Sequence, residues 1–126
     1  MNQGLTLSDT EKSIASWMWL LCFFTGLFAL IPAMFGRLAQ VNGFTYTNAT
    51  HALNFWLTEL VFSIVLSILS IIAYAQEWVE QESIVLVRVS LMVLFFIWHS
   101  YHCIKGAITA HRGHVYRPIF SYQFIK

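Results

Sequence analysis

Two apolar stretches decide the fold of this chain: ALNFWLTELVFSIVLSILSIIAY at residues 52–74 and IVLVRVSLMVLFFIWHSYHCI at residues 84–104. They contain 23 and 21 residues. A helix rises about 1.5 Å per residue, so about 20 residues cross a hydrocarbon core of about 30 Å. Residues 75–83, between the stretches, form a short polar segment with three glutamates and no basic residue. The sequence therefore predicts a hairpin of two membrane-spanning helices.

The composition also indicates a membrane protein. Hydrophobic residues make up 58% of the 126-residue chain and charged residues only 10%, whereas about 25% of a soluble domain is charged. So short a chain cannot enclose that much apolar surface in a water-soluble core. We therefore expect a single integral membrane domain over residues 1–126, without a cleavable signal peptide. The net charge of +1 gives no indication of a nucleic-acid partner.

Residues 14–35 form a third apolar stretch, with no charge over 22 positions. Ser8 and Glu11 have the spacing of a capping box, so we expect a helix to begin there. Pro32 is expected to kink or terminate this helix near its end. Small side chains on one face would let another helix approach closely. They are Ala15, Cys22, Gly26, Ala29 and Ala33.

Residues 36–51 are predicted to be a polar loop in which Thr47 or Asn48 caps the following span. Basic residues are concentrated in this loop and in the tail, and positive charge favours the cytoplasmic side. The C-terminus is therefore predicted to be cytoplasmic, in the inner (plasma) membrane, and three spans then place the N-terminus in the periplasm. The basic residues are Arg37, Lys105, Arg112, Arg117 and Lys126.

The tail at residues 105–126 is predicted to begin as a continuation of the last helix to Arg112, where Gly113 is a favourable stop. Beyond it, the chain is rich in aromatic residues, and Pro118 argues against a helix. We expect this extended aromatic tail to lie on the membrane surface or to pack back against the bundle. The predicted fold is thus an all-α transmembrane bundle of three or four spans with an extended tail.

Ionisable and polar residues interrupt both spans of the hairpin. A charge at mid-membrane costs about 2.5–3.5 kcal/mol, so it needs a partner, a cavity or a function. Folding the hairpin about residue 79 sets Glu59 opposite His99, and Arg88 opposite Ser70. The predicted polar cluster comprises Glu59, Ser63, Ser67 and Ser70 on the second span and Arg88, His99 and His102 on the third.

Three interpretations of the polar cluster are open. In the first, which we favour, the residues are polar contacts that hold the helices together, as is common in membranes. A Glu59–His99 pair is also the kind of group that relays protons or ions. The third interpretation is a binding surface for a partner helix.

Two histidine pairs, His99 with His102 and His111 with His114, have the i, i+3 spacing that suits a metal or haem. Haem ligation by two histidines needs them on two helices, and the other spans have none at matching depth. We therefore predict no cofactor and no metal site. No nucleophile–base set or glycine-rich phosphate loop is evident, so we predict no catalytic residues and no enzymatic activity.

Two signatures carry a family resemblance. Residues 52–55, ALNF, resemble the "EALNFQ" signature of a widespread bacterial family of small membrane proteins of unknown function. Residues 108–126, ITAHRGHVYRPIFSYQFIK, are similar to the ending of that family. The family is grouped with the chloroplast translocon Tic-twenty-like proteins and with magnetosome membrane proteins of the MamF type. The resemblance implies a multi-pass inner-membrane protein without established enzymatic activity, and it adds Asn54 to the polar cluster.

These observations favour a non-enzymatic accessory or assembly subunit that acts through helix–helix contacts with other membrane proteins or with copies of itself. The alternative is a small oligomeric channel or transporter. Its lining would be the stripe of Glu59, Ser63, Ser67 and Ser70.

Overall fold

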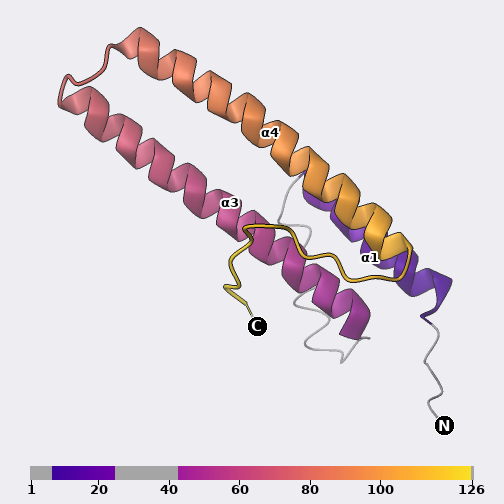
Figure 1. Ribbon diagram of the computed structural model, residues 1–126. Coiled ribbons are helices and arrows are strands. Elements are labelled where there is room, and N and C mark those ends of the chain that lie inside the picture. Colours follow the sequence, from indigo (N-terminus) through magenta and orange to yellow (C-terminus); the bar gives the residue numbers. More distant parts are fainter. Residues whose placement is uncertain (1–6, 25–42, 126) are drawn as a thin grey trace.

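A computed structural model describes residues 7–24 and 43–125. In this part of the chain all regular structure is helical: α1 spans Asp9–Phe24, α3 spans Gly43–Ala75 and α4 spans Gln81–His111. An irregular tail follows α4 and crosses α3 (Figure 1). The all-α prediction therefore holds for the described residues.

The helices α3 and α4 form the predicted antiparallel hairpin (Figure 1), but α3 begins at Gly43 rather than at Ala52. The prediction of a loop that ends with a cap at Thr47 or Asn48 was wrong, because both residues lie inside the helix. Their side chains donate hydrogen bonds to the carbonyls of Gly43 and Phe44, four residues earlier. Such local bonds let polar residues sit within a helix. Residues 36–42 of the predicted loop lie outside the described part.

Both hairpin helices are long and apolar enough to cross a membrane. At about 1.5 Å per residue they measure about 50 Å and about 46 Å, more than a hydrocarbon core of about 30 Å. Only part of each helix can therefore lie in hydrocarbon.

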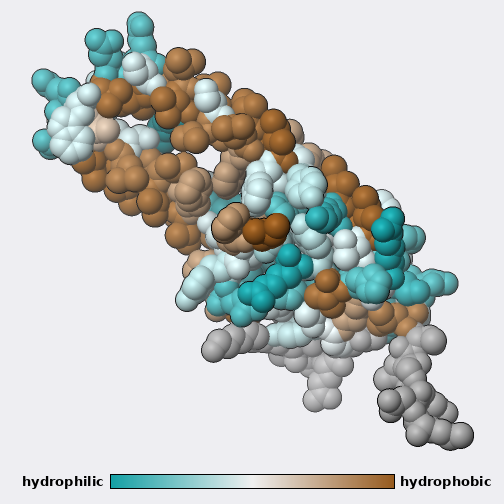
Figure 2. Space-filling model, in the orientation of Figure 1, coloured by the Kyte–Doolittle hydropathy of each residue, from teal (hydrophilic) through white to brown (hydrophobic). Residues whose placement is uncertain are grey.

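Residues 60–98, which we call the hairpin arm, expose large apolar side chains on most sides. Leu86 and Met92 are 69% and 71% exposed, and Ile71 is 65% exposed. Figure 2 shows the hydrophobic surface along the arm and the hydrophilic residues at its turn. Water is an unfavourable solvent for such a surface, whereas lipid is not.

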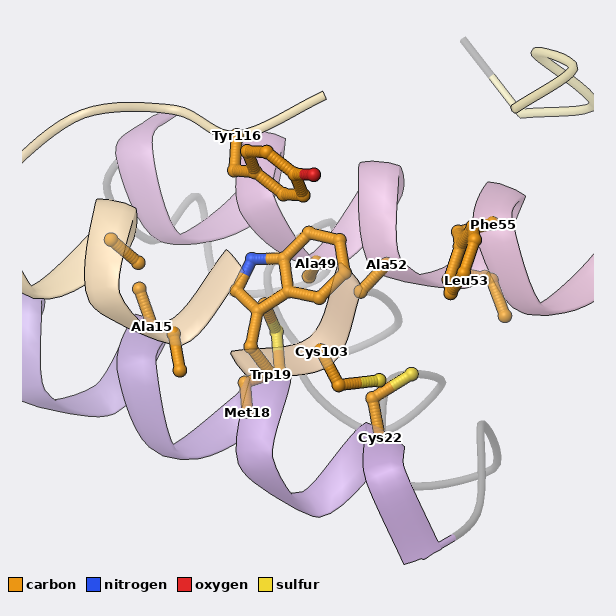
Figure 3. Packing of buried hydrophobic residues seen from close by; sticks show 12 residues of the cluster. Ala15, Met18, Trp19, Cys22, Ala49, Ala52, Leu53, Phe55, Cys103 and Tyr116 are labelled. Atoms are coloured by element: carbon orange, nitrogen blue, oxygen red, sulfur yellow. The ribbon is translucent and has the colours of Figure 1, made fainter. Parts of the chain in front are cut away.

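The core lies at the other end of the hairpin, which we call the packed end. There α1 packs against residues 43–59 of α3 and residues 99–111 of α4, and the tail covers them. Figure 3 shows this packing around Trp19. The buried hydrophobic residues are Ala15, Met18, Trp19, Cys22, Ala49, Ala52, Leu53, Phe55, Cys103, Ala107, Ala110 and Tyr116.

Three complete spans would make α1 run parallel to α4, but the structure shows the opposite direction. Lys12 lies beside Gly113, and the Trp19 ring lies against Gly106, so α1 runs antiparallel to α4. The beginning of α1 and the end of α4 therefore lie at the same end of the molecule, whereas three crossings would separate them. The three-span bundle is thus not confirmed. Residues 25–35 of the predicted first span, with Gly26, Ala29, Pro32 and Ala33, lie outside the described residues.

The predicted start of α1 and the predicted end of α4 are confirmed. The Ser8 amide donates to Glu11 Oε2 at 3.0 Å and the Glu11 amide to Ser8 Oγ at 3.2 Å, which is a capping box. At the end of α4, the amides of Gly113 and His114 donate to the carbonyls of Ala110 and Thr109. This is a Schellman motif, and Gly113 adopts the positive φ of 81° that it requires.

The tail packs back against the bundle, which is one of the two arrangements predicted for it; the other was a tail on the membrane surface. Asn54 donates through Nδ2 to the Ile125 carbonyl and accepts the Ile125 amide at Oδ1, both at 2.9 Å. The Tyr122 amide donates to Thr58 Oγ1 at 3.0 Å. Two polar side chains of α3 thus fix the end of the chain through its backbone.

The contact between Gly106 and Trp19 gives a direct test of this packing. A Cβ at residue 106 would lie 2.4 Å from the buried indole ring, whereas one at Gly43 would meet nothing within 4 Å. We expect Gly106→Ala to lower the stability by about 1–3 kcal/mol, the usual effect of overpacking. Thermal unfolding in detergent, followed by tryptophan fluorescence, measures this effect. Gly43→Ala is the matched control, and equal midpoints for the two variants would contradict the packing.

Candidate functional site

Glu59 and His99 meet at the junction between the arm and the packed end. Glu59 Oε2 lies 2.6 Å from His99 Nδ1, so the predicted contact is confirmed in the structure. Only 9% and 15% of the two side chains are exposed. The Phe55 ring stacks on the imidazole, with centroids 5.9 Å apart and planes 13° apart. A buried acid and imidazole thus satisfy each other in an otherwise aromatic setting.

The second nitrogen of His99 faces α1 and its own helix. His99 Nε2 lies 3.3 Å from the Phe23 carbonyl oxygen and 3.6 Å from Cys103 Sγ. The short contact between Glu59 Oε2 and His99 Nδ1 therefore holds one proton between the two residues. His99 Nε2, the other nitrogen that can carry a proton, faces a carbonyl and a thiol. Chemically, this arrangement can hold and pass a proton.

Glu59 Oε1 is buried and makes no hydrogen bond to the described residues. An unpaired buried carboxyl oxygen costs free energy, so it is a position where water, a proton or a cation would be favourable. In the part of the chain that the structure describes, however, no group of three or more His, Cys, Asp or Glu residues is arranged to hold a metal ion.

His102 lies close to this pair but serves a different contact. Its Nδ1 is hydrogen-bonded to the Tyr116 hydroxyl at 2.6 Å, and its ring packs edge-on against Trp98 with centroids 4.3 Å apart. Burial, opposed by the nearby Lys105 ammonium, raises the pKa of the Tyr116 phenol, which therefore stays protonated and can donate. His102 thus ties the tail to α4, as Asn54 ties it to α3.

The remaining members of the polar cluster lie on the arm, apart from this group. The hydroxyls of Ser67 and Ser70 donate to carbonyls of their own helix, those of Ser63 and Leu66. Arg88 Nη2 donates to Ser67 Oγ at 3.2 Å, one turn from Ser70, the residue that the predicted folding of the hairpin sets opposite Arg88. The arginine side chain is long enough to reach a residue one turn away from the one directly opposite.

Asn48 is the residue that the sequence reasoning missed. It is fully buried, and its Oδ1 accepts the Trp19 indole N–H at 3.2 Å and the Tyr116 amide at 3.4 Å. A signal was present, because Asn48 precedes Glu59 by about three helical turns and so lies on the same face. The prediction of a loop at residues 36–51 obscured it.

The pairing of Glu59 with His99 can be tested by exchanging the two residues. Each single variant, Glu59→His or His99→Glu, should lose about 1–3 kcal/mol of stability because it leaves a buried polar group unpaired. The double exchange should recover most of this loss, because the same two groups face each other again. Thermal midpoints in detergent measure the effect, and Glu82→Gln, at an exposed position in the first turn of α4, is the control. A double variant no more stable than the single ones would refute the pairing.

The comparisons with known proteins identify one family. Neither the curated proteins nor the solved structures include a match to the chain. The model of one family, described as the magnetosome magnetite crystal formation protein family (MamF/MmsF), matches residues 10–125. This match covers α1, both hairpin helices and nearly all of the tail, and it confirms the MamF-type part of the resemblance. The chain therefore belongs to the magnetosome magnetite crystal formation protein family.

Proposed function

We propose that the protein is a non-enzymatic accessory or assembly subunit of a bacterial inner membrane, and that it takes part in magnetite crystal formation through helix–helix contacts. The family match supports a role in magnetite crystal formation, because the model of a family described by that process matches residues 10–125. The observation that supports helix–helix contacts as the mode of action is the exposed apolar surface of the hairpin arm. Its apolar side chains face outward on most sides, so lipid or other helices must cover them.

The proposed topology follows from the charges and the packing. The arm crosses the hydrocarbon core, and the acidic turn lies at one membrane face. The packed end lies at the cytoplasmic face, because Lys105, Arg112 and Arg117 are exposed there. Since the beginning of α1 lies beside the end of α4, it shares that face. This replaces the predicted periplasmic N-terminus and makes the number of crossings even.

The proposed partners are the lipid bilayer and either further membrane proteins or copies of this chain. Apolar surface alone gives helices little reason to associate in lipid, so polar groups and close packing decide such contacts. Arg88 is a charged group that the arm offers to a neighbour, because it is exposed although its Nη2 donates to Ser67 Oγ. An acceptor on a neighbouring helix would lower the cost of keeping this charge in the membrane.

The alternative function is a small oligomeric channel or transporter lined by Glu59, Ser63, Ser67 and Ser70. It draws on the predicted relation to the Tic-twenty-like translocon proteins. The hydrogen bonds favour the subunit over the channel, because Ser67 and Ser70 donate to their own helix and Glu59 is paired with His99. The serine hydroxyl protons and Glu59 Oε2 are thus engaged within the chain, whereas Glu59 Oε1 has no hydrogen bond to the described residues.

The role in crystal formation can be tested by complementation in a magnetite-forming bacterium that lacks its own members of this family. We expect wild-type protein to shift the mean crystal length, measured by electron microscopy, towards that of the parent strain. Gly106→Ala should restore less at equal abundance in the membrane, because it disturbs the packed end, and Gly43→Ala should match wild type. Wild-type protein that reaches the membrane and leaves the crystals unchanged would contradict the proposal.

Proton flux into liposomes distinguishes the proposed function as a subunit from the alternative function as a channel. For the subunit, wild-type protein and Glu59→Gln should both leak no faster than liposomes without protein. A wild-type leak that Glu59→Gln abolishes would establish the channel instead.

A further inference from the structure

The two cysteines of the described chain meet in the core of the packed end. Cys22 lies on α1 and Cys103 on α4, and both are fully buried. Their side chains point towards one another (Figure 3). The close contact of Trp19 with Gly106, one turn away on each helix, holds the two backbones near each other. The pair is thus held by the packing of two separate helices.

A base stands beside this thiol pair. Cys103 Sγ lies 3.6 Å from His99 Nε2, and His99 Nδ1 is bound to Glu59 Oε2 at 2.6 Å. The order thiol, imidazole, carboxylate is the order by which proteins activate a sulfur nucleophile. His99 and Cys103 are four residues apart on α4, so one face of a single helix supplies both groups. Buried cysteines that act only as small apolar side chains do not need a base.

We propose that Cys22 and Cys103 are an oxidisable dithiol, which a two-electron oxidant of the peroxide class converts into a disulfide between α1 and α4. The inference rests on the geometry of the four residues and not on the proposed role in crystal formation.

The reaction balances with one peroxide. In the tautomer that carries its proton on Nδ1, towards Glu59, His99 Nε2 is unprotonated and takes the proton of the Cys103 thiol. The thiolate then attacks one oxygen of hydrogen peroxide, so that an S–O bond forms and the O–O bond breaks. The departing hydroxide receives the proton from the imidazole and leaves as water. Cys22 then attacks the sulfenic acid on Cys103, the S–S bond forms, and the second water leaves with the Cys22 proton. Two thiols and one peroxide thus give one disulfide and two waters.

The disulfide would restrict the movement of α1 relative to α4. In the reduced protein, packing and hydrogen bonds hold α1 to the hairpin. In the oxidised protein, a covalent bond would fix it to α4 across most of the chain length, which removes freedom from the unfolded state. Oxidation should therefore raise the thermal midpoint of the wild-type protein, and reduction should reverse the increase.

Thiol counting on the full chain in detergent tests the proposal. The reduced protein is treated with hydrogen peroxide, denatured and labelled with a maleimide polymer that shifts its mobility on a gel. We expect both thiols to be lost together in the monomer, the intact mass to fall by two hydrogen atoms, and a phosphine reductant to restore both thiols. Retention of both thiols, loss of only one, or crosslinking between chains alone would overturn the proposal.

Variants separate the roles of the four residues. Cys22→Ser and Cys103→Ser each leave one cysteine, so neither should form a crosslink within the chain. His99→Gln should slow the loss of thiols at least about tenfold and give the same disulfide in the end, because His99 positions and deprotonates the thiol but forms no bond to it. If His99→Gln fails to fold, the dependence of the wild-type rate on pH replaces it. A rate unchanged by His99→Gln, or one that follows pH as an unassisted thiol does, would contradict the role of His99.

Discussion

The side chain of Asn48 joins three separate parts of the chain, and the packed end depends on it. Its Oδ1 accepts the Trp19 indole N–H from α1 and the Tyr116 amide from the tail, while its Nδ2 donates to the Phe44 carbonyl of its own helix. The residue is fully buried. In an apolar setting, each unpaired donor would cost about 1–3 kcal/mol, so these bonds fix the orientation of Trp19 and of the tail together.

The other features of the packed end follow from this arrangement. With Trp19 held in place, its ring fills the space that Gly106 leaves open, which sets the distance between α1 and α4. At that distance Cys22 meets Cys103, and the Phe23 carbonyl reaches His99. Beyond this level α1 ends, and the two hairpin helices continue as the hairpin arm (Figure 1). In the described part of the chain, the buried polar groups thus gather where the three helices meet, and apolar groups face outward along the rest of α3 and α4.

The sequence was sufficient for the features that depend on helical period and chain direction. The hairpin, the capping box at Ser8 and Glu11, the stop at Gly113 and the contact of Glu59 with His99 all follow from local spacing. The start of α3 could not be read in this way, because residues 43–51 have the polar composition of a loop. Their helical conformation depends on contacts with distant residues, such as the bonds of Asn48 to α1 and the tail. The direction of α1, and with it the meeting of Cys22 with Cys103, depends on packing that spacing within one helix does not encode.

Hydrogen exchange of the Trp19 indole N–H tests the central role of Asn48 most directly. Nuclear magnetic resonance resolves the indole signals in detergent, and Trp19→Phe assigns the signal of interest. Trp19 is fully buried and bonded to Asn48, whereas Trp17 on the same helix is 61% exposed. We expect the Trp19 indole to exchange far more slowly than that of Trp17, and Asn48→Ala to remove most of this protection. Equal exchange of the two indoles in the wild-type protein would contradict the central role of Asn48.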